Sequence, residues 1–160
     1  MAETAYFDSN LWIACLVGEP TKPEVEALIT EIKQARGTII TSILTITEIS
    51  VHTFQQAPNK VAEGVDFVSN IASLRNVSLD VALLTAQIEA GFMNTVWADT
   101  DGRRRRRWDA LHLATAAVSR ADVVYTYDDR LLRADFSRES RIPPIRRPQP
   151  LQGALPLRSN

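Results

Sequence analysis

The sequence predicts an α/β fold: a single domain with a mostly parallel central sheet flanked by helices. Short runs of β-forming residues alternate along the chain with longer segments whose apolar residues recur at helical spacing, which is typical of parallel sheets. The chain has 160 residues, enough for one domain with a substantial core. Its 45% hydrophobic and 23% charged residues are the balance of an ordinary soluble globular protein.

Five strands are expected, each a short run that includes β-branched or aromatic residues. They comprise residues 4–7 (TAYF), 38–41 (TIIT), 76–79, 122–127 (DVVYTY) and 142–146. The last is expected at an edge of the sheet, because Pro143 and Pro144 lack the amide hydrogens that a central strand needs. The ligand site of such a sheet lies beyond the carboxyl ends of its strands.

The predicted helices begin at capping residues, and glycine or proline ends several of them. Ser9 or Asn10 is expected to cap the first helix, which Gly18 ends. The third helix also has isoleucines and threonines that suit a strand. In chain order the helices comprise residues 9–17, 22–36, 42–55, 61–71, 80–97, 109–119 and one turn at 129–133. Residues 98–107 predict a polar loop, and residues 149–160 a Pro-containing tail after a domain of residues 1–148.

Charge and cysteine content narrow the classes of function. The formal net charge is −1, so composition alone indicates no nucleic-acid partner, and any basic function must come from local clusters. The single cysteine, Cys15, excludes an intrachain disulfide, and its apolar neighbours favour a buried structural thiol. The N-terminus lacks a basic segment before its apolar run, and residues 11–17 are far fewer than the ~20 that span a bilayer. A cytoplasmic protein without membrane association is expected.

Four acidic residues are embedded in apolar sequence, where a charged side chain is costly unless it is paired or binds a metal. Asp8 ends the first strand, and Glu48 lies in the helix after the second strand. Asp109 begins a helix that is apolar nearly all round, and Asp128 follows the fourth strand. Structural alternatives exist for each: a helix N-cap for Asp8 and a boundary residue for Glu48. For Asp109 the alternative is an acid in the first turn of a helix, which the helix dipole favours. For Asp128 it is a turn residue.

In a parallel sheet these four acids are expected to gather at one edge, because strands that run the same way end at the same edge. Carboxylates gathered there repel one another, and one or more divalent cations relieve the repulsion. Oxygen ligands with retained waters suit Mg²⁺ or Mn²⁺. Such ions activate water and hold a phosphodiester. The sequence therefore predicts a metal site that contains Asp8, Glu48, Asp109 and Asp128.

Basic residues immediately precede Asp109, and two explanations for them stay open. The run comprises Arg103, Arg104, Arg105, Arg106 and Arg107. It is either a solvated loop or a candidate RNA-binding segment. Cations just before a helix start lie at the positive end of the dipole, where a phosphate backbone or an acidic protein segment would offset the cost. His112 shares a helix face with Asp109; it either contacts a scissile phosphate or, more simply, hydrogen-bonds Asp109.

Four motifs resemble those of PIN domains, most closely the VapC-type toxins of prokaryotic toxin–antitoxin pairs. They are FDSN (7–10), SILTITEI (42–49), WDALHLATA (108–116) and VVYTYDDRL (123–131), in the family's order within residues 1–148. The resemblance implies that the catalytic acids, which hold Mg²⁺ or Mn²⁺ directly or through water, are Asp8, Glu48, Asp109 and Asp128. It also implies that Asn10 and Thr126 orient carboxylates and waters around the metal.

The activity implied by the resemblance is that of a metal-dependent endoribonuclease. It would cleave single-stranded or looped RNA with a metal-activated water and leave a 5′-phosphate and a 3′-hydroxyl. A cognate antitoxin that covers the site, and a homodimer, are also implied. The alternative is a PIN fold that binds RNA or a partner without cleaving, which the intact set of acids argues against. A phosphatase of the haloacid-dehalogenase type is disfavoured, because Asn10 stands where that family needs a second aspartate.

Overall fold

Five parallel strands form the central sheet of the computed structural model, in the order β3-β2-β1-β4-β5. The structure describes residues 2–91, 102–137 and 139–149, and the side chains of residues 56 and 102–106 are outside the description. The strands are β1 (Thr4–Phe7), β2 (Thr38–Ser42), β3 (Ser73–Arg75), β4 (Val123–Tyr125) and β5 (Ile145–Arg146). The predicted α/β class with a parallel sheet is confirmed, and β5 lies at an edge as expected.

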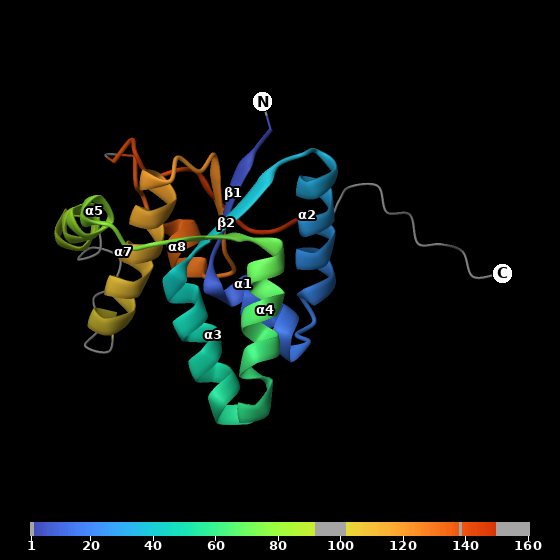
Figure 1. Cartoon of the computed structure of the whole chain (residues 1–160). Helices are drawn as coiled ribbons and strands as arrows, with labels where there is room; N and C mark the ends of the chain where they lie inside the picture. Colours follow the sequence, from blue (N-terminus) through green and yellow to red (C-terminus); the bar gives the residue numbers. More distant parts are fainter. Residues whose placement is uncertain (1, 92–101, 138, 150–160) are drawn as a thin grey trace.

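Helices cover both faces of the sheet, with α5 and α7 on the opposite side from α2 (Figure 1). They are α1 (Ser9–Val17), α2 (Lys22–Gln34), α3 (Ile43–Gln56), α4 (Val61–Ile71), α5 (Leu79–Gly91), α7 (Gly102–Val118) and α8 (Asp129–Arg133), with a 3-10 turn η1 (Pro58–Lys60) before α4. Within the described ranges no helix is long and apolar enough to cross a membrane.

Strand alternation divides the core into two clusters. Ala5 and Phe7 of β1 face α1, α2, α3 and α4, whereas Tyr6 faces α5 and α7. Cys15 belongs to the first cluster; it is buried as predicted, and burial raises the pKa of its thiol to about 11. Since side chains two positions apart share a face, Asp8 continues the face of Tyr6 beyond the end of the strand. The alternation of β1 therefore directs Asp8 toward α7.

Three local predictions are wrong. The third strand is Ser73–Arg75, because the chain pairs with β2 directly after α4, and the predicted segment 76–79 instead leads into α5. The cap of α1 is Asp8, whose Oδ1 accepts a hydrogen bond from the Ser9 amide; Ser9 and Asn10 lie inside the helix. Residues 102–107 are helical and not a loop, since arginine is a good helix former. The predicted parts at residues 92–101 and 150–160 lie outside the described residues.

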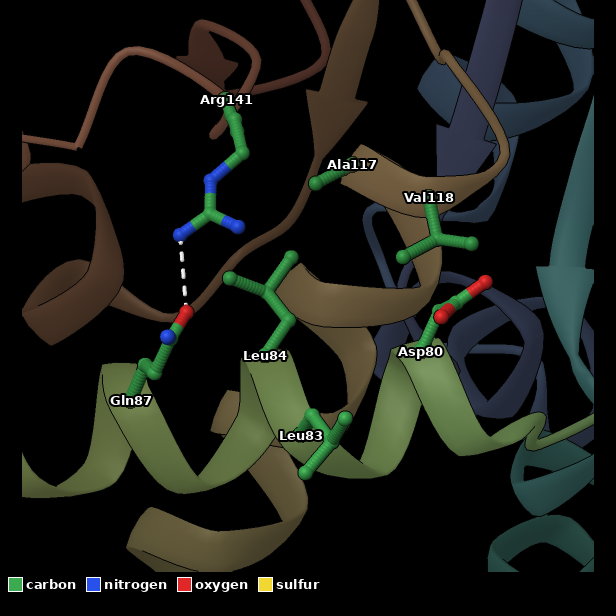
Figure 2. A pocket seen from close by; sticks show the side chains of 7 residues that line it. All are labelled: Asp80, Leu83, Leu84, Gln87, Ala117, Val118 and Arg141. Atoms are coloured by element: carbon green, nitrogen blue, oxygen red, sulfur yellow. Dashed lines mark hydrogen bonds between the residues drawn. The ribbon is translucent and has the colours of Figure 1, made fainter.

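A cavity of about 360 Å³ lies between α5 and α7. Figure 2 shows the side chains that line it: Asp80, Leu83, Leu84, Gln87, Ala117, Val118 and Arg141. The guanidinium of Arg141 donates a hydrogen bond of 2.9 Å to Gln87 Oε1, which connects the segment before β5 to α5 (Figure 2). None of the four predicted acids lines this cavity.

Candidate active site

The four acids gather around the point where the strand order of the sheet reverses. From β1 the chain proceeds outward to β2 and β3, and it then returns to the other side of β1 to form β4. Loops that leave two adjacent strands in opposite directions create a crevice at their carboxyl ends, which is the usual ligand site of such sheets. Asp8 follows β1 at this crevice, and Thr126 and Asp128 follow β4.

Asp8 is held by a network that joins the ends of β1 and β4. Its Oδ2 accepts hydrogen bonds from Asn10 Nδ2 at 2.8 Å and from Thr126 Oγ1 at 2.7 Å. Asn10 Nδ2 also donates to Thr126 Oγ1, and its Oδ1 accepts from the Tyr127 amide. Burial, and to a smaller extent Glu48, raise the pKa of Asp8, although the charge of His112 and the hydrogen bond from Thr126 favour the charged form. Asn10 and Thr126 therefore lie where they orient the Asp8 carboxylate.

Glu48 is held by a buried chain of side chains that begins on β1. His112 Nε2–H donates to Glu48 Oε2 at 2.8 Å, and His112 Nδ1 is 2.6 Å from the hydroxyl of Tyr6. That hydroxyl also accepts from the Ser42 amide. Burial raises the pKa of Glu48, but its hydrogen bond with His112 and the charge of His112 outweigh burial and lower it. Burial lowers the pKa of His112, but Glu48, and then Asp8, raise it more.

The predicted roles of His112 need correction in one respect. Its expected hydrogen bond to Asp109 is wrong, because both ring nitrogens are used by Tyr6 and Glu48. The residue is only 2% exposed, which argues against the predicted contact with RNA. Sequence spacing placed it beside Asp109 on the helix, but its partner Glu48 is 64 positions away in the chain. Tyr6 was missed altogether, although it lies two residues before Asp8 in the strand.

Asp109 differs from the other acids because its carboxylate has an atom without a partner. Oδ2 is buried and accepts no hydrogen bond from the residues that the structure describes. Burial, together with the charges of Asp8 and Asp128, raises the pKa of Asp109 to about 7. The residue lies in the interior of α7, so the predicted first-turn position and its dipole argument are wrong. A buried carboxylate of this kind needs either a proton or a cation.

Asp128 is fully paired, in contrast to Asp109. It caps α8 by accepting from the Arg130 amide at 2.8 Å. The Arg130 guanidinium donates to both carboxylate oxygens, from Nε to Oδ1 at 3.2 Å and from Nη2 to Oδ2 at 3.0 Å. Partial burial raises the pKa of Asp128, but these bonds with Arg130 lower it below its usual range. No sequence pattern identified Arg130 as a residue of the site.

The carboxylate oxygens of the site are the kind of ligand that a divalent cation prefers, but their side chains are not arranged as a ready metal site. Electrostatic effects couple Asp109 to Asp8 and Asp128, and Asp8 to Glu48, so the carboxylates are close enough to repel one another. The unpartnered Oδ2 of Asp109 is the acceptor that such an ion would satisfy. In the described part of the chain, however, no three His, Cys, Asp or Glu side chains form a ready metal-binding group.

The arginine run forms the first turns of α7. Arg107 donates from Nε to Glu89 Oε2 of α5 at 3.0 Å, and its side chain is 68% exposed. Arg107 and Asp109 are two residues apart and therefore point to different sides of the helix. The side chains of Arg103, Arg104, Arg105 and Arg106 lie outside the described residues, so their predicted RNA contacts stay a prediction.

The fold and the acidic crevice define a class of protein: an α/β domain with carboxylates at the switch point of a parallel sheet. A family model for the PIN domain matches residues 5–137. Because this match covers most of the chain, the chain belongs to the PIN domain family, and the resemblance in its four motifs is confirmed. Membership supports a nuclease at the level of protein class. No curated protein sequence matches the chain.

Solved structures with a similar fold include two VapBC structures and one VapC toxin. VapBC2 from Rickettsia felis, bound to a promoter DNA fragment, has a TM-score of 0.62 at 12% identity, covering 90% of this chain and 98% of that chain. VapBC-1 from nontypeable Haemophilus influenzae has a TM-score of 0.61 at 14% identity, with coverages of 90% and 97%. Mycobacterium tuberculosis VapC20, a sarcin-ricin loop cleaving toxin, has a TM-score of 0.58 at 14% identity, with coverages of 79% and 92%. At these identities the likeness shows the fold.

Proposed function

We propose that this protein is a metal-dependent endoribonuclease that cleaves single-stranded or looped RNA. The observation that carries the proposal is Asp109: a buried carboxylate with an unpartnered oxygen and a pKa of about 7, beside Asp8 in the crevice. Such a site is costly for a protein that has no cation to place there. A pure binding module has no need of it, so a metal-assisted hydrolase explains the arrangement better.

The proposed metal ligands are Asp8, Glu48 and Asp109, which supply the oxygen donors that Mg²⁺ or Mn²⁺ prefers. A cation held there would activate water and neutralise charge on a phosphodiester. Asn10 and Thr126 fix the orientation of Asp8, while His112 and Tyr6 fix that of Glu48. Asp128 was predicted as a fourth ligand, but Arg130 binds both its carboxylate oxygens, so the proposed set has three members.

The biological setting that we propose is a toxin–antitoxin pair. The fold is shared with chains of VapBC complexes, one of which is bound to promoter DNA, and with a toxin that cleaves the sarcin-ricin loop. By this analogy a cognate antitoxin covers the crevice until the toxin is released. A homodimer and a cytoplasmic location belong to the same proposal. Measurement of the mass in solution tests the homodimer, and cell fractionation tests the location.

The decisive test compares purified wild-type protein with Asp8→Asn on short single-stranded and hairpin RNAs. We expect cleavage with Mg²⁺ or Mn²⁺, products with a 5′-phosphate, and no cleavage in EDTA. Sequencing RNA ends after expression of each variant in cells would then identify the target. Full activity of Asp8→Asn would contradict the catalytic assignment. Metal-supported RNA binding without any cleavage would instead favour a non-catalytic PIN module.

A further inference from the structure

The pair formed by Asp128 and Arg130 is built more tightly than a surface ion pair. Two guanidinium nitrogens of Arg130 donate to the two carboxylate oxygens, at 3.2 Å and 3.0 Å, and the Arg130 amide donates to Oδ1 at 2.8 Å. A two-pronged arrangement of this kind fixes the plane and direction of the guanidinium as well as its distance. Only 18% of the Asp128 side chain is exposed, so the anchor is set into the protein.

This pair belongs to the crevice and not to the outer surface. Thr126 Oγ1 donates to Asp8 and accepts from the Asp128 amide at 3.0 Å, so one hydroxyl connects the two acids. The charge of Arg130 also acts on Asp109 across the crevice. Arg130 is therefore a cation at the edge of an otherwise acidic site.

An acidic crevice that receives RNA needs a cation that reaches the phosphate. Two cationic groups act electrostatically on Asp109, namely His112 and Arg130. His112 is buried, and both of its ring nitrogens are used within the protein. Arg130 keeps 41% of its side chain exposed.

The neighbouring pair on the same helix provides a contrast. Arg133 lies 3.5 Å from Asp129, with its side chain 80% exposed, and Asp129 is also bound by Arg147. Among the described residues, the hydrogen bonds that connect Asp8, Thr126 and Asp128 do not include Asp129. Arg133 therefore has the charge and the helix of Arg130 without its place at the crevice.

We propose that Arg130, oriented by Asp128, contacts a phosphate of the bound RNA, and that Asp128 serves as its anchor and not as a metal ligand. The inference rests on the proposed ribonuclease function and names a substrate-binding residue within it. It assigns Asp128 a positioning role that differs from the roles of Asp8 and Asp109. A guanidinium fits this task because its planar donors match the oxygens of a carboxylate and of a phosphate alike.

The test uses the full chain and four variants: Arg130→Gln, Asp128→Asn, the double variant, and Arg133→Gln as a control of equal charge on the same helix. Asparagine also caps helices well, so Asp128→Asn retains the start of α8. Affinity for a labelled single-stranded RNA is measured in EDTA, where no cleavage occurs. Affinity for Mn²⁺ is measured by calorimetry without RNA. Neither measurement depends on catalytic turnover.

We expect Arg130→Gln and Asp128→Asn each to weaken RNA binding by about 10-fold, the usual effect of losing a charge-assisted hydrogen bond. The double variant should bind RNA about as tightly as either single variant, because both changes remove the same phosphate contact. Loss of a negative charge by itself strengthens RNA binding, so weaker binding by Asp128→Asn is the signature of an anchor. Mn²⁺ affinity should stay close to wild type throughout, and Arg133→Gln should weaken RNA binding less than Arg130→Gln.

Two results would overturn the inference. If Asp128→Asn loses Mn²⁺ affinity while Arg130→Gln gains it, Asp128 is a metal ligand that Arg130 blocks. If Arg130→Gln and Arg133→Gln bind RNA with the same affinity, Arg130 contributes only its positive charge and makes no specific phosphate contact. Failure of the proposed function looks different: the wild type then neither binds nor cleaves RNA, and the inference fails with it. If the wild type cleaves RNA and both arginine variants bind RNA equally well, the proposed function stands and only the role of Arg130 is rejected.

Discussion

Asp109 and Asp128 lie at the same edge of the sheet, yet their carboxylates have opposite surroundings. Asp109 has a buried oxygen without a partner, and its pKa is raised to about 7. Asp128 accepts from one amide and two guanidinium nitrogens, and its pKa is lowered. Residue type is the same in both cases. The difference teaches that the environment, and not the side chain, assigns each acid its task.

The largest expected effect is on cleavage by Asp109→Asn. Removal of an outer partner of a metal ligand costs about 10–100-fold in metal affinity or activity, and loss of a proposed ligand should exceed that range. RNA cleavage with Mn²⁺ is measured beside wild type and Asp66→Asn, a control in the exposed part of α4. Asp128→Asn is expected to retain more activity than Asp109→Asn. Equal losses in the two variants would erase the proposed distinction between the two acids.

The second prediction concerns the chain that supports Glu48. Tyr6→Phe removes the hydroxyl that contacts His112 and Ser42 while the ring stays in place. We expect Mn²⁺ affinity to fall by about 10-fold, the lower end of the range for partners beyond the ligands themselves. Calorimetry without RNA measures it. Tyr127→Phe is the matched control, because its hydroxyl points to Thr21 and Glu24 of the α2 region; an equal loss there would show that the effect is unspecific.

Stability without metal should respond to pH with opposite signs at the two acids. The pKa of Asp109 is raised on folding, so the folded state binds more protons than the unfolded state between about pH 4 and pH 7. Its contribution to the free energy of unfolding therefore falls as pH rises through this window. The lowered pKa of Asp128 instead adds stability above its unfolded pKa, which is lost as pH falls.

Urea unfolding in EDTA at several pH values measures these contributions. At pH 8 we expect Asp109→Asn to be more stable than wild type by on the order of a few kcal/mol, because the neutral amide avoids burial of a charge. Asp128→Asn should be less stable by on the order of 1 kcal/mol. Toward pH 4 the Asp109→Asn gain should disappear. Destabilisation by Asp109→Asn at pH 8 would show that this carboxylate is satisfied in solution. Added Mn²⁺ should stabilise the wild type more than Asp109→Asn.

The smallest expected effect is that of Arg107→Ser on RNA binding. Arg107 pairs with Glu89 and points to a different side of α7 from Asp109, so its loss should change RNA affinity little. Replacement of residues 103–107 by serine is expected to weaken binding and to flatten its dependence on salt, if the predicted contacts of this run are made. An unchanged slope in the five-residue variant would exclude the run from the RNA path.

The parts of the fold that the sequence predicted correctly depend on short-range patterns. β1, α1 and α8 were expected at their observed residues, because β-forming runs and the helix-ending Gly18 act over a few positions. The run of arginines was expected as a loop, because it lacks apolar residues. It is helical because arginine favours a helix and Arg107 finds Glu89 on α5, a contact that no local pattern contains.

By itself the sequence determined that Asp8 and Asp128 reach the carboxyl edge of the sheet, since each follows the end of a strand. Glu48 and Asp109 lie inside helices, and packing brings them to the same edge. Only the tertiary structure decided which of them have partners. Asn10 and Thr126 meet across 116 positions to hold Asp8, and His112 meets Glu48 across 64. Asp109 finds no such partner for Oδ2 within the described ranges of the chain. Hydrogen bonds and charge pairs depend on atoms that approach within about 3 Å, and only folding brings residues so distant in the chain to that separation.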